Sequence, residues 1–212
     1  MTDMPVFGIL CCGKDIAELA VSVKCCSYIT KIMKNGGYSL GGYHTALLKR
    51  GDDGLIKLCG DKLYHLCRTC DAVFTVGCDG FSPDDIIPDI TIKLCESEAV
   101  FFTRQLCGVS DIGNYDKVHK GKKEKTMFSP SRSRAGILCN ALVMNIRNDE
   151  DFIGKTISSM ISPLSFAVEG LSGKSAESAK RINESLFAIC AVGGCSKKQR
   201  NIFDEVQNSE IK

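Results

Sequence analysis

The sequence predicts a single α/β domain, a three-layer sandwich in which a mostly parallel β-sheet is covered by helices on both faces. The chain has 212 residues and a hydrophobic content of 44%, which is enough to bury one core of this kind. Short, continuous apolar runs alternate along it with segments of helical periodicity. Such runs are typical of parallel strands, which are buried on both faces because a helix connects each strand to the next.

The individual elements follow from where the apolar runs begin and where glycines end them. Gly13 and Gly77 each close an apolar run, and the pair Gly36-Gly37 ends the first helical segment. The strands are predicted at residues 5–12, 38–48, 72–76 and 136–146, and the helices at residues 16–33 and 55–70. We therefore expect two strand–helix units, a third strand, and one longer strand near the end of the core.

The last part of the chain differs in composition from the rest. After Lys174 small and polar residues prevail, and a helix is predicted over residues 176–190. We therefore divide the chain into a domain of residues 1–174 and a C-terminal appendage of residues 175–212. Residues 117–125 are rich in lysine and lack apolar periodicity, so we expect an exposed loop there. That loop either attracts an anionic ligand or is simply solvated.

Charge and hydropathy exclude several classes of partner. The chain has 27 basic and 25 acidic residues, so its formal charge of +2 gives no basic field that would attract nucleic acid. The apolar run at residues 6–12 is too short to span a membrane, and Asp3 stands where a secretory signal would have basic residues. We expect a cytoplasmic protein with reduced thiols and with neither a nucleic-acid nor a membrane partner.

The thirteen cysteines are interpreted as small core residues. Adjacent pairs such as Cys11-Cys12 point in different directions from the backbone, which suits packing better than a metal cage. Only Cys67-x-x-Cys70 has a spacing typical of zinc ligands, and no second pair completes a set of four. We interpret Cys67 and Cys70 as two positions on a helix. The three histidines lie in no nucleophile or metal-binding pattern.

The loop of residues 77–89 is the segment in which we expect a binding site. It follows the third strand directly, at the carboxyl edge of the predicted sheet, where open α/β sheets bind their ligands. Its glycines permit the close approach of a ligand, and Asp84, Asp85 and Asp89 provide hard oxygen ligands suited to Mg²⁺. The alternative is an ordinary acidic turn in which Asp89 caps the following helix.

Two segments resemble one known family. Residues 75–91, T-V-G-C-D-G-F-S-P-D-D-I-I-P-D-I-T, resemble the motif T-T-G-G-T-G-F-A-P-R-D-V-T-P-E-A-T of the molybdopterin-binding (MoaB/Mog) family, which includes bacterial molybdopterin adenylyltransferases and the G domain of gephyrin. Residues 131–137 and 141–146 resemble its motif S-R-x-x-A-G-I-R-G-x-T-L-I-x-N-L-P-G. The resemblance covers residues 5–172, and two matches in the same order are more specific than either alone.

The resemblance implies a MoaB/Mog-like fold and a role in molybdenum cofactor biosynthesis. Family members use Mg²⁺ and ATP to transfer an adenylyl group to the terminal phosphate of molybdopterin, releasing pyrophosphate. Asp85 aligns with their essential aspartate, so it is the catalytic candidate and, with Asp84, the metal-binding candidate. The resemblance also implies a homo-oligomer, a trimer or hexamer. The candidate ligand-binding residues are Gly77, Cys78, Asp79, Gly80, Ser131, Arg132 and Asn145.

The departures from the family motifs gather at this site. Cys78 replaces a glycine, Asp79 a threonine, and Asp84 an arginine, and the family's N-terminal S-D-R motif is absent from residues 8–15. A misplaced unit charge about 4 Å from a phosphate costs roughly 1 kcal/mol in water-like surroundings and about 4 kcal/mol at an effective dielectric constant of 20. Arg147 or the lysine-rich loop would offset the lost positive charge, and so would additional Mg²⁺ held by the aspartates.

Three functions are therefore compatible with the sequence. The first is a divergent molybdopterin adenylyltransferase that works through Asp85. The second is a non-catalytic binding or assembly module, and the third is a protein that binds another anionic ligand at the same edge. Cys78 is either a small substitute for glycine or a reactive thiol, if a helix N-terminus lowers its pKa.

Overall fold

The computed structural model describes residues 4–107 and 131–174. The lysine-rich run at residues 117–125 and the helix predicted at residues 176–190 lie outside the described residues. Six strands form one sheet in the order β2-β1-β3-β6-β5-β4. The strands are β1 (Val6–Gly13), β2 (Ser39–Leu47), β3 (Ala72–Val76), β4 (Ser97–Glu98), β5 (Ala135–Leu138) and β6 (Ala141–Ile146). The helices are α1 (Ile16–Asn35), α2 (Asp53–Thr69), α3 (Ile87–Leu94), α4 (Val100–Leu106) and α5 (Glu150–Ser172).

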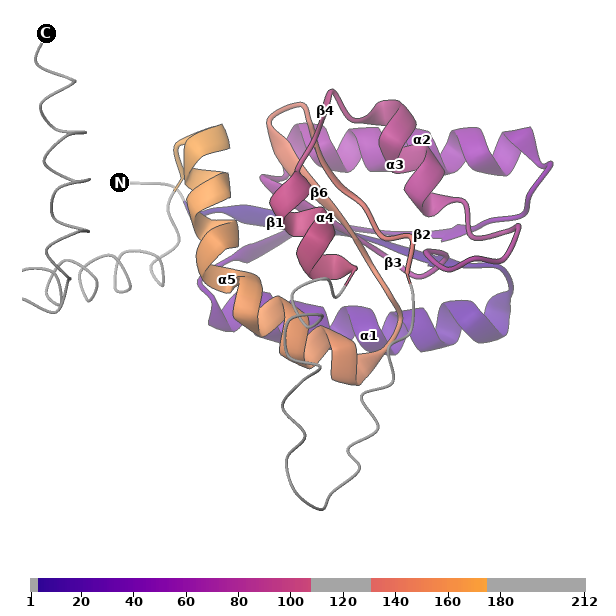
Figure 1. Ribbon diagram of the computed structural model, residues 1–212, viewed down its shortest axis with the longest axis horizontal. Helices are drawn as coiled ribbons and strands as arrows, with labels where there is room; N and C mark the ends of the chain where they lie inside the picture. The colour runs from indigo at the N-terminus through magenta and orange to yellow at the C-terminus, as the bar shows by residue number, and fades with distance from the viewer. Residues whose placement is uncertain (1–3, 108–130, 175–212) are drawn as a thin grey trace, which may run out of the picture.

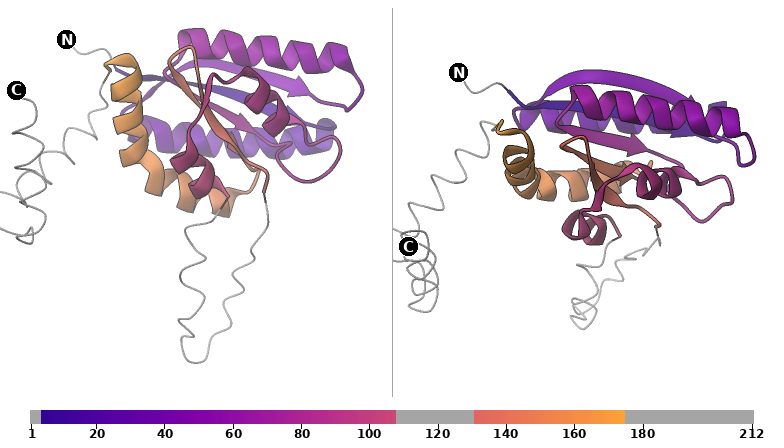
Figure 2. Two further views of the ribbon diagram at one scale, coloured as in Figure 1. Left: turned by 45° about the horizontal axis from the view of Figure 1, so that its top comes forward. Right: turned by 90° about the horizontal axis from the view of Figure 1, so that it is seen from above.

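The expected three-layer α/β architecture is confirmed. Strands β2, β1, β3 and β6 are parallel to one another, whereas β5 and β4 are antiparallel to their neighbours. Helix α1 lies below the sheet with α5, and α2 lies above it (Figure 1). The same layers are seen after the molecule is turned forward (Figure 2, left). The sheet therefore has a hydrophobic core on each face, as its continuous apolar strands predict.

The prediction of a single strand at residues 136–146 is wrong. The segment forms the hairpin β5–β6, in which Ala135 lies opposite Met144 and Leu138 opposite Ala141. Cys139 and Asn140 form the turn, with φ angles of 53° and 62°. Two consecutive residues with positive φ are the geometry of the tight turns that join antiparallel strands. Both strands of the hairpin are apolar. The hydrophobic pattern therefore does not indicate where the turn between them lies.

Helix α5 was not among the elements expected from the pattern. Its N-cap is Asp149, whose side chain accepts a hydrogen bond from the backbone N–H of Phe152, and its C-cap is Gly173, which has a left-handed conformation. Buried residues follow the helical repeat along one face: Ile153, Ile157, Met160, Leu164 and Val168. Acidic residues at the start and a glycine at the end are the sequence signals that would have located this helix.

The cysteines pack inside the domain, as expected. Eight of the eleven in the described ranges are buried, and all eleven are free thiols. Cys67 and Cys70 belong to the core on the α2 face, where Cys67 is in α2 and Cys70 caps its C-terminus. Cys67 therefore lies on a helix as expected, whereas Cys70 follows the last helical residue and has an extended conformation. Within the described ranges, no helix combines the length and the apolar character needed to cross a membrane.

Candidate functional site

The loop after β3 begins with two residues in the left-handed conformation. Gly77 has a φ of 90° and Cys78 a φ of 55°. A Cβ atom on residue 77 would lie 2.6 Å from the carbonyl oxygen of Cys12 and from the hydroxyl of Ser22, so only glycine fits there. At Cys78 the backbone keeps a conformation that favours glycine although a side chain is present, which costs about 1–2 kcal/mol. The turn after β3 therefore has a backbone conformation that two consecutive glycines would adopt without strain.

The side chain of Cys78 points into the protein. The residue is 2% exposed and belongs to the core cluster on the α2 face, together with Cys12 and Cys59. Burial, reinforced by the carboxylates of Glu18 and Asp85, raises the pKa of the Cys78 thiol above its ordinary value. The interpretation of Cys78 as a thiol activated by a lowered pKa is therefore wrong, because desolvation disfavours the thiolate.

Asp79 is a buried carboxylate that joins the two family-like segments. Its Oδ2 atom accepts hydrogen bonds from the hydroxyls of Ser131, at 2.8 Å, and Ser133, at 2.7 Å. The backbone N–H of Arg132 also donates to the carbonyl oxygen of Asp79, at 3.1 Å. The loop after β3 and the segment before β5 thus meet at the same edge of the sheet, although some fifty residues separate them in the chain.

The acidic residues of the loop do not converge on one point. The Oδ1 atom of Asp84 accepts from the backbone N–H of Arg50, at 2.9 Å, while Asp85 turns inward and accepts from the N–H of Ser82, at 2.8 Å. Asp89 pairs with Arg132, whose Nη2 atom lies 2.6 Å from its Oδ1. The structure therefore separates Asp84 from Asp85 and gives Asp79 and Asp89 other partners, instead of assembling one cluster of aspartates.

Asp89 is also not the cap of the following helix. Helix α3 is preceded by Ile86, which makes no side-chain capping hydrogen bond, and Asp89 lies in the first turn instead. A carboxylate in that position is stabilised by the positive end of the helix dipole and here also by Arg132. The alternative interpretation of the loop, a turn capped by Asp89, is thus wrong in its detail.

Lys14 and Glu18 belong to this site although the sequence pattern does not indicate them. The ammonium of Lys14 lies 3.4 Å from Oδ1 of Asp85 and 3.7 Å from Oε2 of Glu18. Burial acts to lower the pKa of Lys14, but the neighbouring carboxylates, Asp85 first, outweigh burial and raise it. Lys14 lies in the segment where the family's S-D-R motif is absent. The positive charge at the site therefore comes from a lysine and not from the arginine of that motif.

Gly80 leaves room for the carboxylate of Asp85. A Cβ atom on Gly80 would lie 2.7 Å from Oδ2 of Asp85, closer than real contacts allow. The N-terminus of α1 completes the surroundings: Asp15 caps it by accepting from the N–H of Glu18, at 2.8 Å, and Glu18 accepts from the N–H of Lys14, at 2.9 Å. The start of α1 and the loop after β3 thereby hold Asp85 and Glu18 close together.

Asn145, a predicted ligand-binding residue, is 0% exposed. Its side-chain amide donates to the hydroxyls of Thr75, at 2.9 Å, and Thr91, at 2.8 Å, and its oxygen accepts from the N–H of Arg134, at 3.0 Å. These bonds connect β6 with β3, α3 and the start of β5. The side chain of Asn145 is therefore enclosed, and its hydrogen bonds are made within the protein. Arg147 places its guanidinium 4.5 Å from the ring centre of Phe152.

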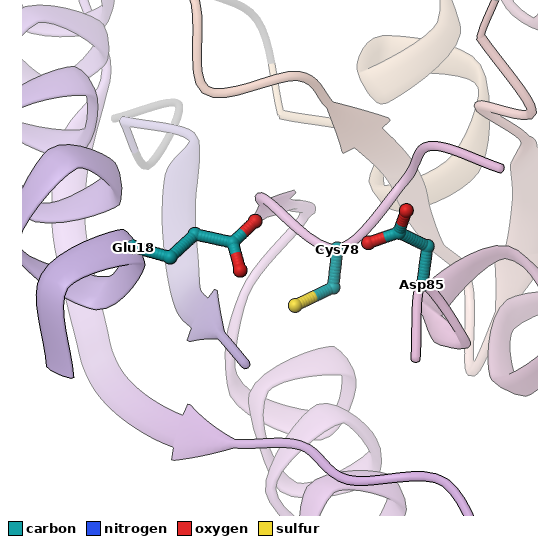
Figure 3. A group of neighbouring side chains, drawn as sticks. All are labelled: Glu18, Cys78 and Asp85. Carbon is teal, nitrogen blue, oxygen red and sulfur yellow. The ribbon is translucent and has the colours of Figure 1, made fainter. Parts of the chain in front are cut away.

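Three potential metal ligands meet where α1 and the loop approach each other. Within the part of the chain that the structure describes, Glu18, Cys78 and Asp85 form the one group of this kind, and their ligand atoms all lie within 4.8 Å of one another. Cys78 lies between the two carboxylates (Figure 3). For Mg²⁺, the fitting residues are Asp85 and Glu18, because Mg²⁺ prefers oxygen, while Asp84 is directed elsewhere.

Comparison with solved structures finds molybdopterin biosynthesis proteins. The molybdopterin biosynthesis enzyme MoaB from Thermus thermophilus has a TM-score of 0.66 and 18% identity, over 82% of this chain and 100% of that one. A tungsten cofactor synthesizing protein MoaB from Pyrococcus furiosus has a TM-score of 0.59 and 16% identity, over 79% of this chain and 97% of that one. MogA has a TM-score of 0.59 and 15% identity, over 79% of this chain and 99% of that one.

These likenesses confirm the MoaB/Mog-like fold that the sequence resemblance implies. At identities of 18% and below they establish the fold and leave the chemistry to the residues of the site. No family model matches the sequence. No curated protein matches it either.

Proposed function

We propose that this chain is a molybdenum cofactor biosynthesis protein that binds molybdopterin at the loop of residues 77–89. The observation that carries the proposal is the junction at Asp79. Hydrogen bonds from Ser131 and Ser133 bring the two family-like segments together at the carboxyl edge of a MoaB/Mog-like fold. Ligands of open α/β sheets bind at this edge. The left-handed turn at Gly77 and Cys78 further supports a loop shaped like that of the family.

We further propose adenylyl transfer from Mg-ATP to molybdopterin as the reaction. In this reaction a terminal phosphate oxygen of molybdopterin forms a bond to the α-phosphorus of ATP, and the bond from that phosphorus to the pyrophosphate oxygen breaks. Asp85 and Glu18 would hold Mg²⁺, which supplies charge neutralisation on the phosphates. Lys14 would place a positive charge beside the same phosphates, because its ammonium lies next to both carboxylates.

A non-catalytic binding module is the second candidate, and the charge of the site favours it. Among the described residues, five acidic ones line the loop and two basic side chains pair with them: Glu18, Asp79, Asp84, Asp85 and Asp89, with Lys14 and Arg132 as the partners. Such an excess of negative charge disfavours a polyphosphate unless cations compensate it. On this account the fold would present a surface or a pterin pocket without activating ATP.

The experiment that separates the two candidates is an anaerobic assay of the full chain with molybdopterin, Mg²⁺ and ATP. Formation of adenylyl-molybdopterin and pyrophosphate would be followed for the native protein and for Asp85→Asn. Asp89→Asn is the matched control, since Asp89 belongs to the same loop but pairs with Arg132. Turnover that only Asp85→Asn abolishes supports the transferase.

Binding without turnover would favour the non-catalytic module. It is measured by the rise in melting temperature with molybdopterin, since a ligand that binds the folded state raises its stability by mass action. No turnover together with no shift in melting temperature would refute molybdopterin binding itself.

A further inference from the structure

We propose that Glu18, Cys78 and Asp85 form a binding site for a thiophilic divalent cation such as Zn²⁺. The three side chains come from separate parts of the fold: Glu18 from the first turn of α1, Cys78 from the turn after β3, and Asp85 from the segment before α3. Their ligand atoms lie within 4.8 Å of one another. The site shares Glu18 and Asp85 with the Mg²⁺ site proposed above. Metal binding is measured without pterin or nucleotide, so the failure of this proposal is distinguishable from the failure of the proposed function.

The separation of the three ligands is close to that of a filled site. With bonds of about 2.0–2.3 Å to Zn²⁺ and tetrahedral angles, neighbouring ligand atoms lie roughly 3.3–3.8 Å apart. The observed limit of 4.8 Å exceeds that by about 1 Å. Glu18 is half-buried and carries its carboxylate on a flexible side chain, so rotation about its bonds closes this gap without moving the backbone.

The thiol of Cys78 points independently to a ligand. The residue is 2% exposed, and among the described residues no hydrogen bond to its Sγ atom is present. Other thiols of the core do have such partners, for example Cys12 with the carbonyl of Leu10 and Cys107 with that of Ser133. A buried sulfur between two carboxylates (Figure 3) is thus left with its coordinating capacity unused.

Backbone N–H groups already hold the carboxylates of Asp85 and Glu18 in place. Asp85 receives the N–H of Ser82 on Oδ2, and Glu18 receives the N–H of Lys14 on Oε2. Each has a second oxygen for a cation. Oδ1 of Asp85 pairs with the Lys14 ammonium, and among the described residues none donates to Oε1 of Glu18. Hydrogen bonds of this kind orient the oxygens that bind metal and are typical of metal sites.

The ligand chemistry selects the cation. A thiolate is a soft ligand that suits Zn²⁺ or Co²⁺ and is poorly suited to Mg²⁺, which requires oxygen. On binding, a metal–sulfur bond forms and the S–H bond of Cys78 breaks, so one proton passes to the solvent. Three protein ligands also leave a fourth position open, as in zinc sites that bind a further ligand. Lys14 is one-third exposed and can turn toward solvent as the cation enters.

The test is a titration of the reduced, metal-free full chain with Co²⁺, which gives a charge-transfer absorption when bound by thiolate. We expect one equivalent to bind, an excess of Mg²⁺ not to displace it, and one proton to be released. Cys78→Gly should lose at least about 100-fold in Co²⁺ affinity, because a ligand is removed entirely. We expect this variant to fold, because residue 78 has a φ of 55°, a conformation that favours glycine.

Two further variants and one control complete the test. Glu18→Gln should weaken Co²⁺ binding, and Lys14→Gln should strengthen it, because the ammonium competes for the same carboxylates. Cys190→Ser/Cys195→Ser is the control for thiols elsewhere in the chain and should leave the absorption unchanged. An absorption that persists in Cys78→Gly, or its absence from the native protein, would overturn the proposal.

Discussion

The hydroxyl of Ser133 donates a 2.7 Å hydrogen bond to the carboxylate of Asp79. Both residues are buried, at 0% and 6% exposure, and Ser131 donates to the same oxygen. A buried carboxylate is costly unless donors compensate the lost hydration, and these two hydroxyls are the compensation. The substitution of the family's threonine by Asp79 is therefore accommodated within the protein, and Asp79 becomes part of the support of the loop.

This relationship is tested by a double-mutant cycle. We expect Asp79→Ala to lower the free energy of unfolding by about 2 kcal/mol, since hydrogen bonds to a charged group are lost and two hydroxyls are left without their acceptor. Combined with Ser133→Ala, the two losses should be non-additive by at least about 1 kcal/mol. Urea denaturation measures both. Ser27→Ala, at an exposed serine of α1, is the control and should have little effect. Additive losses would show that the two residues act separately.

Gly80 controls the position of Asp85. We expect Gly80→Ala to displace the Asp85 carboxylate, because the added Cβ atom would lie 2.7 Å from Oδ2. The consequence is a loss of cation binding with a stability cost of about 1–3 kcal/mol. The matched control is Gly170→Ala, at a position in α5 with no atom within 4 Å of the new Cβ, which should stabilise the helix by up to about 1 kcal/mol. Unchanged cation affinity in Gly80→Ala would contradict this role.

The ammonium of Lys14 screens the carboxylates of Asp85 and Glu18 from each other. We expect Lys14→Met to lower the free energy of unfolding at pH 7 by about 1 kcal/mol, a modest figure because the lysine is one-third exposed. The pKa of Lys14 is raised above its ordinary 10.5, so the stabilisation is complete below pH 10.5 and is lost as the pH rises through the pKa of the folded state.

The measurement for Lys14 is the difference in unfolding free energy between native protein and variant, from pH 7 to pH 12. The difference should be constant up to pH 10.5 and should then shrink. A difference that is zero at pH 7, or one that grows with pH, would mean that the ion pair does not contribute.

The buried thiols make the domain sensitive to alkali. Burial raises the pKa values of Cys25 and Cys95 to about 11, from an ordinary value of 9.0. A thiol whose pKa is higher in the folded state than in the unfolded state stabilises the protein fully at pH values below its pKa in the unfolded state. That stabilisation is lost as the pH rises toward the pKa of the folded state. We therefore expect the free energy of unfolding to fall by at least about 2 kcal/mol as the pH rises from 9 to 11. Urea denaturation under anaerobic, reducing conditions measures this, and Cys25→Ala should flatten the decline. A stability independent of pH over this range would refute it.

The periodicity of the sequence was sufficient for the layers of the fold and for the position of the loop after β3. Alternating apolar runs and helical segments predicted the parallel strands, and the loop after β3 lies at the carboxyl edge as expected. Both depend on local patterns: which face of an element is apolar, and where a glycine ends it. The hairpin at Cys139 and Asn140 was missed because its two strands are both apolar.

Only the tertiary structure decided how the polar residues are used. The sequence presents Asp79, Asp84 and Asp85 as neighbours, yet their carboxylates bond to Ser133, to the backbone of Arg50 and to Lys14. It gives no sign that the start of α1 approaches this loop, or that Cys78 points inward. Each partner comes from a distant part of the chain, and a carboxylate is directed by whichever donor the packing of helices and strands brings within about 3 Å. The sequence determined the layers of the fold and the edge of the sheet at which the loop lies. The packing of helices and strands determined which polar side chains meet there.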